Sequence, residues 1–165
     1  MKYRKIESDD DVNTLVKIAH EIWNHHFKSM FDSKTLCKLI EAAQSKKTIL
    51  SKIEQDYQYF FIIDEGEKIG YFAYKINPSS DELFLSKIYI YSNKRGQGVG
   101  REVLGHLETL CHDAGIRKIV LTVYHGNIDS IKAYENWGFT NLGLIERIFD
   151  DDLVFMDVKM EKVFN

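Results

Sequence analysis

The stretch from Leu83 to Gly100 constrains the fold of this chain more than any other. Residues 83–91 form a nearly continuous run of apolar, aromatic and β-branched side chains, which is typical of a strand covered on both faces. A basic, glycine-spaced turn follows. From Val99 the apolar residues recur at steps of three and four, which predicts a helix with one buried face. The order strand, glycine loop, helix therefore forms the centre of the predicted fold.

The glycine loop predicts a binding site for a phosphate group. The first turn of a helix has backbone N–H groups without partners, and glycines allow an anion to approach these donors closely. Lys94, Arg95 and Arg101 add positive charge beside the loop. The loop lacks the Gly-Lys-Ser/Thr ending of a nucleoside triphosphate site, and the next glycine, Gly105, comes too late for a dinucleotide fold.

The composition predicts one globular domain over residues 1–165. The chain is 44% hydrophobic, and its 22 basic and 25 acidic residues give a net charge of -3. Because the two signs are intermixed, neither nucleic acid nor a membrane surface is expected as a partner. The chain has no apolar run long enough for a membrane span and no apolar segment behind the charged N-terminus, so we expect a cytoplasmic protein.

The two cysteines are expected to be buried free thiols. Cys37 and Cys111 lie on helical patterns beside apolar neighbours, and they do not form a Cys-x-x-Cys motif. Small buried thiols are common in reducing compartments. This interpretation is therefore preferred to a disulfide or a nucleophile.

The N-terminal third is predicted to be mostly helical. The expected elements are a strand at residues 3–6 and helices at residues 8–22, 33–43 and 46–55. Ser8 and Asp11 form a capping-box-like start for the first helix. The aromatic segment 24–32, between the first two helices, is expected to be irregular.

The rest of the chain predicts a mixed sheet of about seven strands. Further strands are expected at residues 57–63, 68–76, 83–91, 118–124, 139–149 and 153–163, with a short helix at residues 130–137. Short connections make neighbouring strands antiparallel, whereas a full helix separates 83–91 from 118–124. These two strands should therefore be parallel, joined by a right-handed crossover. The expected fold class is α/β of the mixed, α+β type.

Two motifs resemble those of the GCN5-related N-acetyltransferase (GNAT) superfamily. The family's acyl-CoA signature, Arg/Gln-x-x-Gly-x-Gly/Ala, is similar to Arg95-Gly96-Gln97-Gly98-Val99-Gly100. The family's second signature, Asn-x-x-Ser/Ala-x-x-x-Tyr-x-x-x-Gly-Phe, is similar to the segment with Asn127, Ser130, Tyr134, Gly138 and Phe139. The motifs occur in the family's order, and the resemblance covers nearly the whole chain from Tyr57 onward.

The resemblance implies an acyl-CoA N-acyltransferase fold with a seven-stranded sheet that splays at its central parallel strand pair and has helices on both faces. It implies acetyl-CoA as cosubstrate, with no metal and no cysteine intermediate. The pantetheine would contact the central strand, and the pyrophosphate would contact residues 95–101. The implied cofactor-binding residues are Ile88, Tyr89, Ile90, Arg95, Gly96, Gln97, Gly98, Val99, Gly100, Arg101, Asn127, Ser130 and Tyr134.

Tyr134 is the candidate catalytic residue. Ser130 and Tyr134 are four residues apart and therefore share one face of the expected helix. By the resemblance, the Tyr134 phenol would lie near the thioester sulfur and donate a proton or a hydrogen bond to the departing thiolate. The alternative is an aromatic side chain packed in the core.

The general base is not assigned. Relatives often use a glutamate on the central strand, but residues 85–89 of this chain contain no carboxylate. A water relay through Ser86, Tyr89 or backbone carbonyls is the preferred interpretation.

The histidines of the first helix are not spaced for a metal. His20 and His25 are five residues apart, about 140 degrees around a helix, whereas the His-Glu-x-x-His motif needs a spacing of four. His25 and His26 are expected to line a loop beside the acceptor pocket that the resemblance implies. The alternative is a partly buried aromatic packing cluster with Trp23 and Phe27.

The expected reaction is direct acetyl transfer from acetyl-CoA to a primary amine in a ternary complex. A polyamine or similar small amine is the first expectation, and a peptide N-terminus or lysine is the second. Asp150 to Asp152, with Glu146, form an acidic hairpin that could attract a cationic amine, but a solvated turn explains them equally well. The alternative function is an acyl-CoA-binding regulatory or interaction module without turnover. A homodimer through the C-terminal strands stays open, because many relatives pair in this way.

Overall fold

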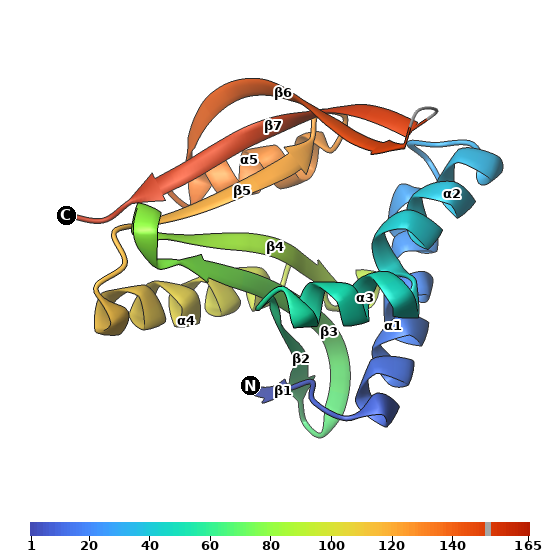
Figure 1. The fold of residues 1–165 in the computed structure, drawn as a ribbon, viewed down its shortest axis with the longest axis horizontal. Coiled ribbons are helices and arrows are strands. Elements are labelled where there is room, and N and C mark those ends of the chain that lie inside the picture. The colour runs from blue at the N-terminus through green and yellow to red at the C-terminus, as the bar shows by residue number, and fades with distance from the viewer. Residues whose placement is uncertain (151–152) are drawn as a thin grey trace. The chain divides into compact units, whose positions relative to one another are not determined.

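The computed structural model describes residues 1–150 and 153–165, and of Asp150 only the backbone. It confirms the predicted fold class (Figure 1). The elements are β1 (Lys2–Lys5), α1 (Asp9–Phe27), α2 (Ser33–Gln44), α3 (Lys46–Glu54), β2 (Gln58–Asp64), β3 (Glu67–Asn77), β4 (Glu82–Ile90), α4 (Val99–Ala114), β5 (Lys118–Tyr124), α5 (Ile128–Asn136), β6 (Thr140–Asp150) and β7 (Leu153–Val163), with two short 3-10 turns, η1 (Pro78–Ser80) and η2 (Ser92–Lys94).

The strands form a seven-stranded sheet in the order β1-β2-β3-β4-β5-β7-β6. β4 and β5 are parallel, as the sequence predicts, and the pairs β1–β2, β2–β3, β5–β7 and β6–β7 are antiparallel. The parallel ladder joins Glu82–Leu85 to Lys118–Leu121, although β4 continues to Ile90 and β5 to Tyr124. The ladder therefore ends before either strand does.

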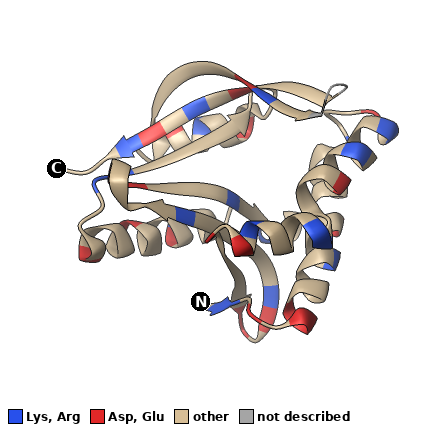
Figure 2. Cartoon of the chain, in the orientation of Figure 1, with Lys and Arg blue, Asp and Glu red and all other residues tan. Residues whose placement is uncertain are grey.

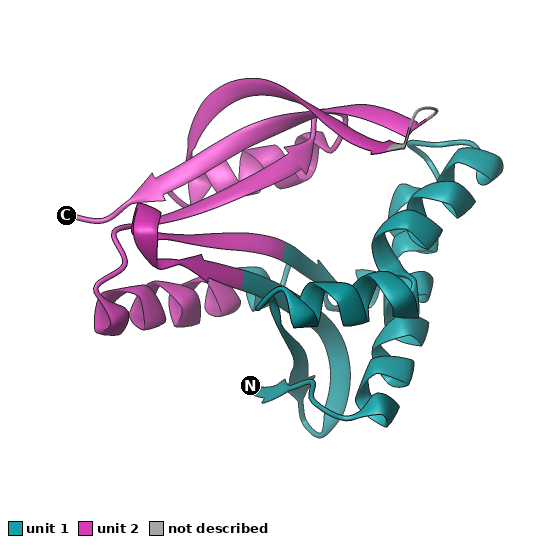
Figure 3. Cartoon of the chain, in the orientation of Figure 1, with its two compact units in different colours: residues 1–74, 87–100 teal, residues 75–86, 101–165 magenta. Residues whose placement is uncertain are grey.

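The chain divides into two compact units, which share β3 and β4 (Figure 3). Unit 1 consists of residues 1–74 and 87–100, and unit 2 of residues 75–86 and 101–165. Unit 1 therefore contains α1 to α3, β1, β2 and the glycine loop. Unit 2 contains most of α4, together with β5 to β7 and α5.

The core of unit 1 forms between helices and strands, each of which has its apolar residues on one face. α1 begins with a complete capping box, in which Ser8 Oγ accepts the Asp11 N–H and the Asp11 carboxylate accepts the Ser8 N–H. The apolar stripe of α1 recurs at steps of three and four, and alternate residues of β2 and β3 face it. The buried residues of this core include Val12, Leu15, Ile18, Ala19, Ile22, Tyr59, Phe61, Tyr71 and Ala73.

The core of unit 2 includes one face of α4 and the strand that follows it. α4 ends before Gly115, whose φ of 69° fits the predicted C-cap. Cys111 on α4 is fully buried, and this burial raises the pKa of its thiol to about 11. Because the thiolate is the nucleophilic form, the raised pKa makes Cys111 a poor nucleophile near neutral pH. The buried apolar residues here include Val103, Leu104, Leu107, Ile119, Val120 and Leu121.

Two local predictions are wrong. α1 continues to Phe27 instead of ending near residue 22, because Trp23 and Phe27 are buried one turn apart and extend its apolar stripe. Cys37 is a free thiol, as predicted, but it is exposed. It lies about 100 degrees from Leu36 around α2, at the border of the buried face.

The predicted acidic turn includes Asp151 and Asp152, which lie outside the described residues.

Gly70 in β3 marks a close approach of two backbones within unit 1. A Cβ atom there would overlap the Tyr89 carbonyl oxygen in β4 and meet the Ile90 Cα atom at 3.0 Å. We expect Gly70→Ala to lower the free energy of unfolding by about 2 kcal/mol, because backbone cannot move aside as a flexible side chain can. Urea denaturation measures this change. The control is Gly105→Ala in α4, where a Cβ meets nothing within 4 Å. This control should be neutral or stabilising by up to about 1 kcal/mol, and equal midpoints for the two variants would contradict the expectation.

Candidate functional site

The glycine loop of unit 1 connects β4 to the first turn of α4. Gly96 and Gly98 have φ values of 73° and 83°. A Cβ atom would meet nothing within 4 Å at either position. Glycine is therefore favoured here by the left-handed backbone conformation and not by a lack of space. This conformation brings the chain into α4 at Val99, which is buried.

The predicted phosphate-binding residues of the loop are consecutive and mostly exposed. The exposed members are Arg95, Gly96, Gln97 and Gly98, and Gly100 is half-buried. The Gln97 Nε2 atom donates a hydrogen bond to the Asn93 carbonyl oxygen at 3.0 Å, which ties the loop to η2. An exposed, glycine-rich segment at a helix N-terminus has the geometry of an anion-binding site.

Arg95 is held by two hydrogen bonds within unit 1. Its Nε atom donates to the Ile90 carbonyl oxygen at 2.9 Å, and its Nη1 atom lies 2.8 Å from the Nδ1 atom of His26 in α1. Partial desolvation lowers the pKa of Arg95, and a nearby tyrosine, Tyr89, acts in the opposite direction. An arginine stays protonated in proteins nonetheless. The loop therefore presents a positive charge with a fixed orientation.

Arg101, in unit 2, has a carboxylate partner that the sequence did not predict. Its Nη1 atom lies 3.2 Å from the Glu108 Oε1 atom, and the Lys162 Nζ atom donates to the same oxygen at 2.7 Å. The Lys162 Nζ atom also donates to the Trp137 carbonyl oxygen at 2.8 Å. Arg101 therefore belongs to a charge network of unit 2.

Tyr89 lies in an aromatic cluster of unit 1. The ring centroids of its neighbours lie 5.0 Å (Trp23), 5.8 Å (Tyr71), 6.2 Å (Phe27) and 6.2 Å (His26) from its own. Lys87, on the same face of β4, has its Nζ atom 5.6 Å from the Trp23 ring centroid. For His26 the cluster agrees with the alternative interpretation, an aromatic packing cluster with Trp23 and Phe27. These residues lie on α1 and not in a loop, and His25 is exposed.

A buried hydrogen-bond chain joins α1, β3 and α2 next to this cluster. Trp23 Nε1 donates to Tyr71 Oη at 2.9 Å, and Tyr71 Oη donates to Gln44 Oε1 at 3.2 Å. The direction is fixed, because an indole N–H only donates and an amide oxygen only accepts. Burial raises the pKa of Tyr71 well above its usual value, so the phenol is neutral. Sequence reasoning missed this chain, and its signal is a polar residue, Gln44, four positions after Ile40 on the apolar face of α2.

The second motif lies on α5, in unit 2. Asn127 is the N-cap residue of α5 and is buried, with 5% of its surface exposed. Its carbonyl oxygen accepts the Ile131 N–H at 3.1 Å. Ser130 is half-buried and lies one turn before Tyr134 on the same face of α5. The three predicted residues of this motif are therefore at one end and along one face of a single helix.

Tyr134 is half-buried and packed on one side by aromatic rings. Its ring centroid lies 5.6 Å from that of Trp137 and 5.4 Å from that of Phe139, both in edge-on geometry. The Tyr134 carbonyl oxygen accepts the N–H groups of both residues, which closes the end of α5. Packing therefore fixes the ring orientation of Tyr134.

Asp157 in β7 is a fully buried carboxylate that sequence reasoning missed. Its Oδ2 atom lies 2.9 Å from the Nε atom of Arg147 in β6, whose side chain is 37% exposed. This contact is an ion pair without hydrogen-bond geometry at Nε. Asp157 pairs with Tyr124 of β5 on one side and with Ile145 of β6 on the other. The signal in the sequence is one acidic residue within the apolar run of β7.

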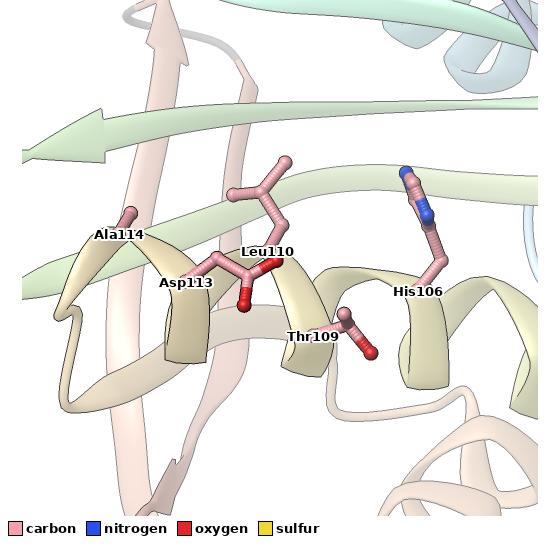
Figure 4. A pocket seen from close by; sticks show the side chains of 5 residues that line it. All are labelled: His106, Thr109, Leu110, Asp113 and Ala114. Atoms are coloured by element: carbon pink, nitrogen blue, oxygen red, sulfur yellow. The ribbon is translucent and has the colours of Figure 1, made fainter.

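A surface hollow of about 430 Å³ lies along the second half of α4 (Figure 4). Its lining residues are His106, Thr109, Leu110, Asp113 and Ala114. Partial burial lowers the pKa of His106, so this imidazole is mainly neutral near pH 7. None of the lining residues belongs to the predicted site, and we assign no function to this hollow.

Charges and candidate metal ligands are dispersed in the described part of the chain. Figure 2 shows basic and acidic residues together on single elements, such as α1 and β7. Within residues 1–150 and 153–165, no group of three or more His, Cys, Asp or Glu residues could hold a metal ion. No described helix combines the length and the apolar character needed to cross a membrane.

Comparisons with known sequences point to one enzyme family. The spermine/spermidine N(1)-acetyltransferase of Bacillus subtilis is 28% identical over 82 residues, which cover 46% of this chain and 54% of that protein. The chain therefore spans about half the length of this relative. The spermidine N(1)-acetyltransferase of Thermoplasma acidophilum is 23% identical over 144 residues, which cover 84% of this chain and 88% of that protein.

Solved structures with the same fold cover nearly the whole chain. The PaiA N-acetyltransferase from Thermoplasma acidophilum in complex with coenzyme A has a TM-score of 0.77 at 21% identity, covering 99% of this chain and 100% of that one. The ribosomal-protein-alanine N-acetyltransferase from Brucella melitensis has a TM-score of 0.67 at 18% identity, with coverages of 99% and 100%. The sequence model of the Acetyltransferase (GNAT) family matches residues 19–139. Since this match spans more than half of the chain, the protein belongs to the GNAT family.

Proposed function

We propose that residues 1–165 form a single N-acetyltransferase domain that transfers the acetyl group of acetyl-CoA to a primary amine. The observation that carries the proposal is the glycine loop between β4 and α4. Its left-handed Gly96 and Gly98 and its oriented Arg95 guanidinium suit the pyrophosphate of a CoA thioester. Membership of the GNAT family supports the same reaction class.

The proposed roles of the cofactor-binding residues rest on backbone hydrogen-bonding groups and on positively charged side chains. The β4–β5 ladder ends at Leu85, so backbone groups from Ile88 to Ile90 are suited to pair with the amides of an extended pantetheine. The N–H groups of residues 96–100 and the Arg95 guanidinium would bind the pyrophosphate. Arg101 is a further proposed contact, through the N–H groups that do not face Glu108. Asn127 and Ser130 are proposed cofactor contacts from α5.

The proposed chemistry is direct attack of a neutral amine on the thioester carbonyl carbon. A nitrogen–carbon bond forms, the carbon–sulfur bond breaks, and the Tyr134 phenol supplies a proton or hydrogen bond to the thiolate. A water relay past Ser86 and Tyr89 is proposed to remove the proton from the amine. The mechanism uses no metal ion, and the high pKa of the Cys111 thiol supports a route without a cysteine intermediate.

A polyamine-like amine is the proposed acceptor, and a peptide amine is the second candidate. Relatives named as spermine or spermidine N(1)-acetyltransferases support the first, and the fold shared with a ribosomal-protein-alanine N-acetyltransferase supports the second. Neither nucleic acid nor a membrane is proposed as a partner, and the net charge of -3 supports this. The free cysteines Cys37 and Cys111 support a reducing, cytoplasmic location.

A thiol-release assay with acetyl-CoA tests the proposed activity. Spermidine, spermine and a short peptide with an N-terminal alanine serve as acceptors, and free CoA is measured with a thiol reagent. Release above the no-acceptor rate with a polyamine supports the first candidate, and release only with the peptide supports the second. Saturable CoA binding without release for any amine would instead support an acyl-CoA-binding regulatory module.

A homodimer through the β6–β7 hairpin is part of the proposal. One face of the hairpin exposes apolar side chains, and β6 is an edge strand of the sheet. The exposed fractions are 61% for Leu144, 65% for Ile148, 46% for Val154 and 38% for Met156. Ile148 and Val154 are direct cross-strand neighbours.

We expect light scattering to give twice the 19.3 kDa mass of one chain. Ile148→Asp should shift the protein to the mass of one chain, because a charge in the centre of a dimer contact is desolvated without a partner. Leu50→Asp is the control, since Leu50 is an exposed apolar residue of α3, in unit 1. A wild-type protein at the mass of one chain would refute the dimer.

A further inference from the structure

The contact between Arg95 and His26 joins two segments that are far apart in the sequence. His26 lies in the last turn of α1, and Arg95 lies in the glycine loop, 69 residues later. Both belong to unit 1. The Arg95 Nη1 atom lies 2.8 Å from His26 Nδ1, while the Arg95 Nε atom is bound to the Ile90 carbonyl oxygen at 2.9 Å. Two hydrogen bonds to different edges of a planar guanidinium define its orientation.

The chemistry of the two groups fixes the protonation state of His26 in this contact. An arginine has only donors, so the His26 Nδ1 atom must accept and cannot carry a hydrogen. The ring is therefore neutral. The charged or titratable groups in contact with it include the Arg95 guanidinium from the loop and the phenol ring of Tyr89 from β4, at a centroid distance of 6.2 Å. A protonated His26 would place a second cation beside Arg95 and lose the acceptor.

His26 is held in place by aromatic packing and not by Arg95 alone. Its ring centroid lies 4.5 Å from that of Phe27, which is buried. Tyr89, the second aromatic neighbour, is itself packed against Trp23 at 5.0 Å. The acceptor atom is therefore presented from a rigid part of unit 1. The Arg95 backbone, in contrast, lies in an exposed loop.

We propose that His26 is a positioning residue that orients Arg95 for the pyrophosphate of acetyl-CoA. The inference rests on the proposed function, because it needs the loop to bind acetyl-CoA. An exposed arginine has many rotamers, and ordering it on binding costs affinity. The contact with His26 removes part of this cost before the ligand arrives. His26, a residue of α1, thereby raises the affinity for acetyl-CoA.

The first test compares donors with and without the pyrophosphate. His26→Leu should raise KM for acetyl-CoA about tenfold at unchanged kcat, as expected for the loss of a hydrogen bond to a charged group. With S-acetylpantetheine, which has no phosphate, the same variant should keep the kcat/KM of the wild type. His26→Asn should restore KM for acetyl-CoA, because the Asn Oδ1 atom can take the place of Nδ1 as acceptor.

The second test uses pH, because a merely structural role would not respond to it. Between about pH 7.5 and pH 5.5 an ordinary histidine gains a proton. KM of the wild type for acetyl-CoA should therefore rise as the pH falls. His26→Asn cannot take up this proton and should show a flatter profile. Any remaining slope belongs to other groups, such as the phosphates of the donor.

The matched control is a surface histidine outside the site. His112→Leu changes an exposed residue near the end of α4, with an ion-pair contact only to its neighbour Asp113 among the described residues. This variant should keep the kcat/KM of the wild type with both acetyl-CoA and S-acetylpantetheine. If His26→Leu fails to fold, the pH profile of His26→Asn carries the test alone.

Two results would overturn the inference. One is an unchanged KM for acetyl-CoA in His26→Leu. The other is an equal loss of kcat/KM with both donors, which would show that His26 does not act through the pyrophosphate. In either case the wild type would still release CoA from acetyl-CoA in the presence of an amine, whereas failure of the proposed function would appear as a wild type that releases none.

Discussion

Replacing Tyr134 with phenylalanine is expected to lower kcat for acetyl transfer by about 10²- to 10³-fold, with little change in KM for acetyl-CoA. The phenol is the proposed donor to the thiolate that forms as the carbon–sulfur bond breaks. Without it, the leaving group departs as a thiolate that lacks this hydrogen-bond donor. Steady-state thiol release with the accepted amine measures the effect.

Because of the packing of Tyr134, this substitution removes the hydroxyl group and keeps the ring contacts. Its ring lies edge-on to Trp137 and Phe139, and phenylalanine preserves both contacts. The thermal unfolding midpoint should therefore stay within a few degrees of the wild type. Tyr57→Phe is the control, because Tyr57 is a half-buried phenol of unit 1 beside Lys52 and lies outside the proposed site. Full turnover in Tyr134→Phe would exclude the acid role.

Replacing Arg147 with methionine is expected to lower the free energy of unfolding by about 3 kcal/mol. The substitution leaves the Asp157 carboxylate in a fully buried position without the cation that lies 2.9 Å from it. Losing a cation contact is more costly for a buried carboxylate than for a surface one. Urea denaturation monitored by circular dichroism measures the change.

A double variant separates the ion pair from simple packing. Arg147→Met combined with Asp157→Leu should recover most of the loss, because apolar residues can replace a buried pair at little cost. Arg4→Met is the matched control at an exposed pair, Arg4 with Asp11, and should cost less than about 1 kcal/mol. If Arg147→Met is as stable as Arg4→Met, the Arg147–Asp157 pair does not stabilise the fold more than the surface pair does.

The sequence predicted those parts of the fold that depend on local periodicity. β5 begins and ends where its β-branched run does, and α4 covers the whole apolar stripe from Val99 to Ala114. The parallel pairing of β4 with β5 followed from the helix between them, since a parallel pair needs a long connection. The positive φ values of Gly96 and Gly98 fit the expected glycine loop.

The rest of the site depends on contacts between residues that are distant in the sequence. Trp23 and Tyr71 are 48 residues apart, and His26 and Arg95 are 69 apart, so no local pattern pairs them. Trp23 and Phe27, which extend the buried face of α1, likewise pack against a distant residue, Tyr89. Tertiary packing, and not local propensity, sets these features.

The glycine loop is proposed to make this chain an acyl-CoA-binding enzyme. A thermal-shift titration with acetyl-CoA tests it most directly, because a ligand that binds only the folded state raises the unfolding midpoint predictably with concentration. Gly98→Val is the paired variant, since a β-branched residue is strained at the φ of 83° found here. We expect a saturable rise of the midpoint for the wild type and a much smaller one for Gly98→Val. No rise in the wild type at millimolar acetyl-CoA would contradict it.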